Sequence, residues 1–190
     1  MSDTPARIVP LQPDRLSDFL RFFDGDAFQD NPKWSSCYCQ CFYEDHTKIE
    51  WSARTATANR DAARSRIGTH EMLGYLAYSG EAVVGWCNAA PRNLLHALDA
   101  EPIHNLSDVG TILCFLVAPS HRGKGVASAL LSAACEGFRS QGLRVAEANP
   151  RPTARGAADN HFGPLNMYLK AGFLLWKTDS DGSVWVRKEL

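Results

Sequence analysis

The stretch Val117-Ala-Pro-Ser-His-Arg-Gly-Lys-Gly-Val-Ala127 joins an apolar segment to an amphipathic one through a basic turn with two glycines. Residues 122–125, Arg-Gly-Lys-Gly, would direct successive backbone N–H groups into one concavity at the start of a helix. The positive end of the helix dipole favours an anion at this place. Because a Cβ would keep phosphate oxygens away from the backbone, glycines suit the turn. The stretch therefore predicts a pyrophosphate-binding turn.

The segments on both sides of the turn have the patterns of a strand and a helix. Thr111–Val117 is a continuous apolar run, which is typical of a central strand covered on both faces. From Val126 to Gln141 apolar residues recur at helical spacing, and Gly142 follows where a helix end favours a positive φ. A further strand is expected at Leu143–Asn149. We thus expect the order strand, turn, helix, strand.

Periodicity and turn residues predict the remaining elements. Ser79-Gly80-Glu81 and Asp181-Gly182 are typical of hairpin turns. We expect strands at Arg7–Val9, Gly74–Tyr78, Ala82–Asn88, Phe173–Thr178 and Ser183–Lys188, and helices at Pro13–Phe23, at Ile49–Gly68 and from Leu165 to a C-terminal Gly172.

Two widespread phosphate-binding motifs fit the turn less well than a third. A Walker P-loop requires glycine where Ala118 stands, and Ser or Thr where Gly125 stands, so it is excluded. A dinucleotide-binding motif fails only at Ser128, and Glu147 lies at about the right distance for a ribose-binding acid. The motif comes late in the chain, with no second βαβ half evident after it. A nucleotide-dependent oxidoreductase stays open as an alternative.

The third pattern is Gln/Arg-x-x-Gly-x-Gly/Ala, which Arg122, Gly125 and Ala127 match at every defined position. It is the signature of the GCN5-related N-acetyltransferases, the GNAT family. Chains of this family usually end as this one does, with a helix that carries a tyrosine (Tyr168) four residues before Gly172-Phe173, followed by a hairpin. The chain resembles the family closely over about its second half, and in element order over its first.

Several further segments look like those of a bacterial branch of the family. They are Pro32–Cys39, Val84–Cys87, Ala90–Arg92, Cys114–Val117 and Phe162–Leu165. The chain departs from the family at His161, where many relatives have Asn, and at Pro164, where many have Ala. These departures concern the acceptor side of the site.

The resemblance implies a mixed α/β (α+β) fold, with a central, mostly antiparallel sheet that splays beside the cofactor strand and is flanked by helices. Residues 1–190 would form a single domain of the GNAT type. The implied activity is direct transfer of an acetyl group from acetyl-CoA, without a metal, to a primary amine of a small molecule. A non-catalytic acyl-CoA-binding sensor with the same fold is a further alternative.

The resemblance also assigns roles to residues. Backbone groups of Phe115, Leu116 and Val117 would pair with the pantetheine arm and polarise the acetyl carbonyl. Tyr168 would protonate the departing thiolate, since a phenol of pKa about 10 can serve as acid for a thiolate whose conjugate acid has a pKa of about 8.5. The pyrophosphate would be held by Arg122, Gly123, Lys124, Gly125, Val126 and Ala127.

No single residue stands out as the general base, because the predicted strand Thr111–Val117 carries no carboxylate. Glu147, on the next strand, is one candidate. His161, Asp108 or a chain of waters are the others.

The family's acceptor site lies under the segment between the first two helices. Here that segment is rich in aromatic residues, which would form a flat apolar wall. We expect Trp34, Tyr38 and His161 to contact the substrate. The alternative is that the aromatic cluster packs in the core.

The six cysteines lack the spacing of a disulfide framework. An alternative role for three of them is a metal site, formed by Cys37, Cys39 and Cys41 with His46. On a strand, residues two apart are separated by about 6.6 Å. That is too far for two sulfurs that must each lie about 2.3 Å from one zinc ion unless the chain turns sharply. We therefore expect no metal, and cysteines that act as small buried apolar groups.

Length and charge limit the classes of protein to which the chain can belong. A chain of 190 residues, 45% of them hydrophobic, can form one sizeable core. A formal net charge of -1 excludes a strongly basic nucleic-acid-binding surface as the main function. With no signal-peptide pattern and no apolar run of membrane-spanning length, we expect a cytoplasmic protein without nucleic-acid or membrane partners. A homodimer is left open.

Overall fold

The computed structural model describes residues 5–98, 106–151 and 158–190. Within these residues one seven-stranded sheet has the order β1-β2-β3-β4-β5-β7-β6. Neighbouring strands are antiparallel except β4 and β5, which are parallel. The strands are β1 Arg7–Pro10, β2 Gly74–Ser79, β3 Ala82–Pro91, β4 Val109–Val117, β5 Val145–Ala148, β6 Leu174–Thr178 and β7 Val184–Glu189. The expected mostly antiparallel sheet is confirmed, and the doubly wound parallel sheet of a dinucleotide-binding domain is excluded.

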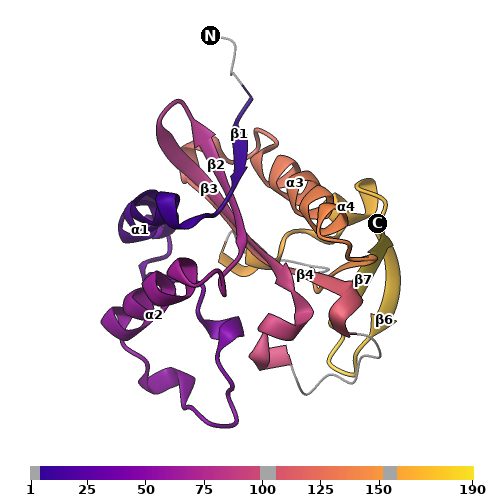
Figure 1. Cartoon of the computed structure of the whole chain (residues 1–190). Helices are drawn as coiled ribbons and strands as arrows, with labels where there is room; N and C mark the ends of the chain where they lie inside the picture. Colours follow the sequence, from indigo (N-terminus) through magenta and orange to yellow (C-terminus); the bar gives the residue numbers. More distant parts are fainter. Residues whose placement is uncertain (1–4, 99–105, 152–157) are drawn as a thin grey trace.

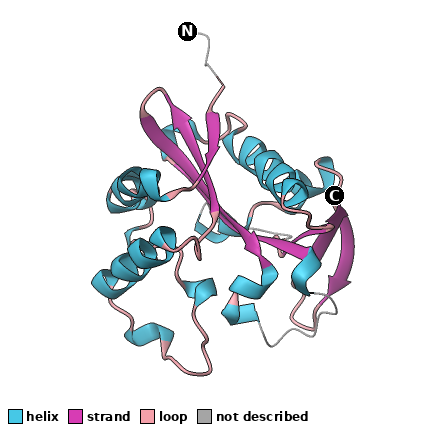
Figure 2. Ribbon diagram, viewed as in Figure 1, coloured by secondary structure: helices cyan, strands magenta, loops and turns pink. Residues whose placement is uncertain are grey.

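Helices cover both faces of the sheet. Helices α1 (Leu16–Asp24) and α2 (Ala56–Gly68) lie on one side of β1–β3, and α3 (Val126–Ser140) crosses the other side (Figures 1 and 2). The short helix α4 (Leu165–Lys170) lies beside the C-terminal strands (Figure 1).

Aromatic packing holds α1 against the sheet. Phe19 and Phe23 stack with ring centroids 4.2 Å apart, and the Phe19 ring meets the edge of Trp86 on β3 at 5.1 Å. All three side chains are buried. Aromatic pairs of this kind add to the free energy gained from burial, which fixes α1 over the centre of the sheet.

β4 has different partners along its two edges. On one edge it pairs with β3 as far as Val117, with a bulge at Leu113 between the pairs Ala89–Ile112 and Asn88–Cys114. On the other edge its pairing with β5 ends at Ile112–Ala148. The second half of β4 therefore has one edge that β5 does not cover. This is the splay that the family resemblance implied.

Several predicted boundaries differ from the observed ones. The second helix begins at Ala56 rather than Ile49, because the Thr55 side chain accepts a hydrogen bond from the Ala58 N–H and caps the helix there. β5 is shorter than the predicted strand Leu143–Asn149, whereas β3 and β4 are longer than predicted. The predicted C-terminal hairpin and the helix that starts at Val126 are confirmed.

None of the helices within the described residues combines the length and apolar character needed to span a membrane.

The close approach of α3 to β4 depends on a glycine. A Cβ on Gly110 would lie 2.5 Å from ring carbons of Phe138, which is buried on α3. We expect Gly110→Ala to lower the free energy of unfolding by about 1–3 kcal/mol, because the ring has to move within a packed core. Urea denaturation measures this change.

The matched control is Gly68→Ala at the end of α2, where a Cβ would meet no atom within 4 Å. It should leave stability unchanged or raise it by up to about 1 kcal/mol. Equal effects of the two substitutions would contradict the packing argument.

Candidate functional site

A cleft of about 500 Å³ opens where β4 and β5 part. Four segments form its walls: the end of β4, the turn that leads into α3, the segment after α1, and the segment that leads into α4. The lining residues are Ala27, Phe28, Asp30, Asn31, Trp34, Phe115–Val117, His121–Gly123, Gly125–Ser128, Asn160, His161, Gly163, Pro164, Asn166, Met167 and Lys170.

The turn into α3 has the geometry of an anion cradle. Gly123 and Gly125 both have left-handed backbones, with φ of 74° and 82°. A Cβ on either would meet no protein atom within 4 Å, and both glycines line the cleft. Gly125 is the N-cap of α3 and supplies no side-chain cap, so the first N–H groups of the helix have no capping acceptor. The open space beside these donors fits a pyrophosphate.

The uncovered edge of β4 presents backbone groups to the cleft. The Ala118 N–H donates to the Val84 carbonyl at 2.9 Å, on the β3 side. Because peptide groups alternate along a strand, those of Val117 and Phe115 point to the opposite side. An extended ligand can pair with them as a short strand.

Arg122 connects this edge to the opposite wall. Its Nε–H donates to the Val117 carbonyl at 2.9 Å, and its two terminal nitrogens both bind the Asp30 carboxylate. Hydrogen bonding to this guanidinium lowers the pKa of Asp30. Asp30 belongs to no recognisable sequence motif, so the sequence did not predict its position at the cleft.

Tyr168 lies behind the cleft wall rather than on it. Its side chain is buried, and its hydroxyl donates to the Phe162 carbonyl at 2.8 Å. Its ring contacts Phe115 edge-on, with centroids 6.4 Å apart, and lies next to Gly163, which lines the cleft. Burial raises the pKa of Tyr168 well above its ordinary value. The buried phenol is therefore a weaker acid than an exposed tyrosine.

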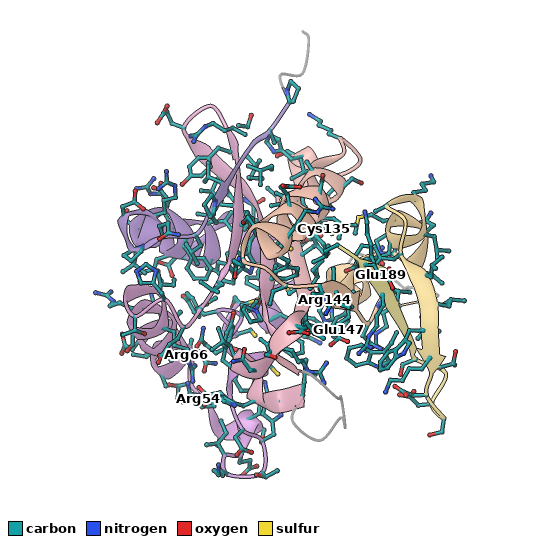
Figure 3. The ribbon with its side chains drawn as sticks, turned by 45° about the vertical axis from the view of Figure 1, so that its right-hand side comes forward. Arg54, Arg66, Cys135, Arg144, Glu147 and Glu189 are labelled. Carbon is teal, nitrogen blue, oxygen red and sulfur yellow. The ribbon has the colours of Figure 1, made fainter. Side chains whose placement is uncertain are left out.

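Glu147 lies in a buried ion network and not in the cleft. Its carboxylate binds Arg92, accepts a hydrogen bond from Thr111 Oγ1 at 3.0 Å, and binds Arg187 Nη2 at 2.9 Å. Figure 3 labels Glu147 inside the molecule, beside the C-terminal hairpin. Both carboxylate oxygens are occupied by these contacts, and Glu147 does not line the cleft. The network favours a structural role for Glu147 over that of the general base.

The acceptor-side candidates separate into two groups. Trp34 and His161 line the cleft, and their rings meet edge-on with centroids 4.5 Å apart. Tyr38 is buried, stacks on Phe23 and donates its hydroxyl to Asp24 at 2.6 Å, so it belongs to the core. Asp108 does not line the cleft either. It directly precedes β4, and its backbone carbonyl accepts a hydrogen bond from the Arg144 N–H. The structure brings His161, but neither Glu147 nor Asp108, to the cleft.

The cysteines are free thiols and contribute no cleft residue. Cys39 is buried and accepts a hydrogen bond from Trp86 Nε1 at 3.2 Å, while His46 Nε2 lies 2.8 Å from the Cys41 carbonyl. Within the described ranges no group of three or more His, Cys, Asp or Glu side chains is arranged to hold a metal ion.

A model of the acetyltransferase (GNAT) family matches residues 31–173. This match spans most of the chain and includes the β4 edge and the glycine turn. The chain belongs to the GNAT family, and it is an acetyltransferase.

Solved structures of GNAT proteins share the fold. The GNAT domain of S. lividans PAT is 21% identical with a TM-score of 0.59, and the match covers 97% of this chain and 90% of that one. The paia N-acetyltransferase from Thermoplasma acidophilum, in complex with coenzyme A, is 14% identical with a TM-score of 0.58 and coverages of 98% and 100%. A phosphinothricin acetyltransferase from Sinorhizobium meliloti, in complex with AcCoA, is 15% identical with a TM-score of 0.59 and coverages of 98% and 89%. A search of curated proteins found no match.

The ion network predicts a large effect of removing the Glu147 charge. We expect Glu147→Gln to lower the free energy of unfolding by about 3–5 kcal/mol, because two guanidinium groups lose their buried counter-ion. Thermal and urea unfolding measure the loss. The opposite result would be unchanged stability together with a reaction rate that no longer falls at low pH. That result would identify Glu147 as the general base.

Proposed function

We propose that this acetyltransferase transfers the acetyl group of acetyl-CoA directly to a primary amine of a small molecule. The observation that carries the proposal is the joint position of the uncovered β4 edge and the glycine turn on one cleft. Two structures of the same fold were solved with coenzyme A or AcCoA, which supports the choice of cofactor.

The cofactor's two polar regions match two parts of the cleft. The N–H groups at the start of α3 and the turn Arg122–Gly125 would hold the pyrophosphate. Lys124 does not line the cleft, so it would act through its charge alone. The peptide group of Phe115 and the N–H of Val117 would pair with the amides of the pantetheine arm, while the Val117 carbonyl stays bound to Arg122. Trp34 and His161 line the same cleft.

Acyl transfer from a thioester requires a neutral amine, a polarised carbonyl and a proton for the leaving thiolate. Acetyl-CoA supplies the activated acyl group when bound. The N–H groups along the β4 edge would polarise its carbonyl. Tyr168 would supply the proton, since a phenol carries its proton at neutral pH and this ring lies next to Gly163 of the cleft wall. For that step its hydroxyl has to leave the Phe162 carbonyl.

His161 is the base candidate that the geometry favours, because it lines the cleft on the acceptor side. A histidine side chain is the group that most often serves as a general base. Trp34 would form the apolar wall against which the amine lies.

We also propose that the protein acts in the cytoplasm. The cysteines are free thiols, which agrees with a reducing compartment.

The decisive experiment measures thiol release from acetyl-CoA with a panel of amines: aminoglycosides, polyamines, amino acids and peptide N-termini. We expect one class of small amine to raise the rate far above that of hydrolysis, with a mass increase of one acetyl group on the amine. No acceleration by any small amine, together with acetylation of peptide or protein N-termini, would contradict the proposed substrate class.

The cradle predicts the effect of a side chain at Gly125. Gly125→Val should remove detectable binding of acetyl-CoA in isothermal titration, because the new side chain enters the space meant for the pyrophosphate and the residue needs a positive φ. Arg122→Ala should weaken binding less, since backbone donors supply much of the site and an exposed charge is screened by salt. Unchanged affinity in folded Gly125→Val would contradict the cradle.

Tyr168→Phe tests the hydroxyl alone, because the ring and its packing are kept. We expect kcat to fall by roughly 10²- to 10⁴-fold with little change in the affinity for acetyl-CoA, as for the loss of one positioned acid. Steady-state kinetics with the best amine from the panel measure both.

A different result would identify a different role for the Tyr168 hydroxyl. If kcat stays within about threefold of wild type while chemistry limits turnover, Tyr168 is not the acid. The hydroxyl would then serve only to hold the Phe162 carbonyl, and the variant would show a lower melting temperature.

A further inference from the structure

One wall of the cleft is a segment that is anchored in the core at its two ends. Phe28 and Tyr38 are buried, and the rings of both pack against α1. Residues 29–35 between them are exposed or half-buried. Their backbone forms short turns, in which the Asn31 and Trp34 N–H groups donate to carbonyls three positions earlier. Because such turns have little stability of their own, contacts across the cleft decide where this 29–35 segment lies.

Asp30 and Trp34 link the 29–35 segment to the other side of the cleft. The Trp34 ring meets the His161 ring edge-on, with centroids 4.5 Å apart. The two carboxylate oxygens of Asp30 bind different terminal nitrogens of Arg122, one of them at 3.0 Å. A two-point contact between a carboxylate and a guanidinium fixes orientation as well as distance. The Asp30–Arg122 pair therefore restrains the segment that carries Trp34.

Arg122 is itself held by the strand that borders the cleft. Its Nε–H donates to the Val117 carbonyl of β4 at 2.9 Å, so contacts inside the protein use most of its N–H donors. Hydrogen bonding to the guanidinium lowers the pKa of Asp30, so the carboxylate is ionised and balances the positive charge. The Arg122 side chain is thus directed to the 29–35 segment, whereas the anion cradle at the start of α3 consists of backbone N–H groups.

We propose that Asp30 is a positioning residue for the amine substrate, which acts through Arg122. The pair holds the 29–35 segment, and with it the Trp34 ring, in a fixed place relative to the β4 edge. The inference rests on the proposed function, because it concerns the acceptor that this function requires. One side chain, Arg122, then connects the two halves of the cleft: it binds the strand on the cofactor side and orients the segment on the acceptor side.

The two partners of the pair should affect the cofactor differently. Asp30 places a negative charge beside the turn that would hold the pyrophosphate. Asp30→Asn should therefore leave the affinity for coenzyme A unchanged or raise it by up to about threefold, whereas Arg122→Ala lowers it. A general loss of structure would instead weaken binding in both variants.

Both variants should raise KM for the amine. In Asp30→Asn an amide nitrogen faces a guanidinium nitrogen, so the two-point contact is lost. We expect an increase of about three- to tenfold in each variant, limited because the Arg122 and Asp30 side chains are 36% and 43% exposed. The double variant should raise KM no more than Arg122→Ala alone, since the two residues act through one contact.

Three measurements on the whole chain test the proposal. Isothermal titration gives the affinity for coenzyme A, and steady-state kinetics with the best amine of the panel give KM. Amide hydrogen exchange of the chain without ligands reports the 29–35 segment directly, and the Asn31 and Trp34 N–H groups should exchange at least about threefold faster in both variants. Circular dichroism and melting temperature confirm that each variant is folded.

The matched control is Asp26→Asn. It makes the same charge change four positions earlier, at a carboxylate that binds Gln29 at 2.7 Å and does not line the cleft. All three measurements should stay at the wild-type values in this variant. An effect equal to that of Asp30→Asn would overturn the proposal, because charge alone would then explain both.

The other outcomes that overturn the proposal are distinct from a failure of the proposed function. Unchanged exchange of the 29–35 segment in both variants would show that the pair does not hold it, whether or not any amine is acetylated. A higher KM in Asp30→Asn together with a lower KM in Arg122→Ala would mean that Asp30 binds the ammonium group directly. If no amine of the panel reacts, the proposed function fails, while exchange and coenzyme A affinity still decide whether the pair restrains the segment.

Discussion

β4 is paired with β3 along nearly its whole length but with β5 only as far as Ile112, and the cleft depends on this difference. A strand in the middle of a sheet normally has both rows of peptide groups bonded. Here the second half of one row is left to the cleft, directly before the chain turns into α3. The uncovered β4 edge and the glycine turn therefore follow each other within about a dozen residues of the chain.

The ion network around Glu147 lies where the two strands are still paired. Thr111 and Glu147 are register partners on β4 and β5, while Arg92 follows β3 and Arg187 comes from β7. The network ties four neighbouring strands together just before β4 and β5 separate. We infer that it fixes the point of separation, because a buried pair of this kind tolerates little displacement.

The sequence was informative where local chemistry decides the structure. The strand before residues 122–125, the glycine turn itself and the helix that follows it were predicted from local sequence, and the structure has them at these places. The roles of these residues in binding a cofactor stay predictions. The acceptor side was predicted less well because long-range contacts decide it. From its residue type and position, Tyr38 was expected to line the acceptor wall. It is instead buried in the core, where its hydroxyl binds Asp24, which lies 14 positions away in the sequence. Likewise, nothing local to Glu147 indicates Arg92 and Arg187, and no motif includes Asp30.

The central claim is that the uncovered β4 edge and the start of α3 form the cofactor site. Amide hydrogen exchange with and without saturating coenzyme A tests it most directly, because it reports each backbone donor separately. The account predicts slower exchange at Phe115, Val117 and Val126–Ser128 in the presence of coenzyme A, with no change in β1 or β2. Protection that appears elsewhere while these amides exchange as before would contradict it.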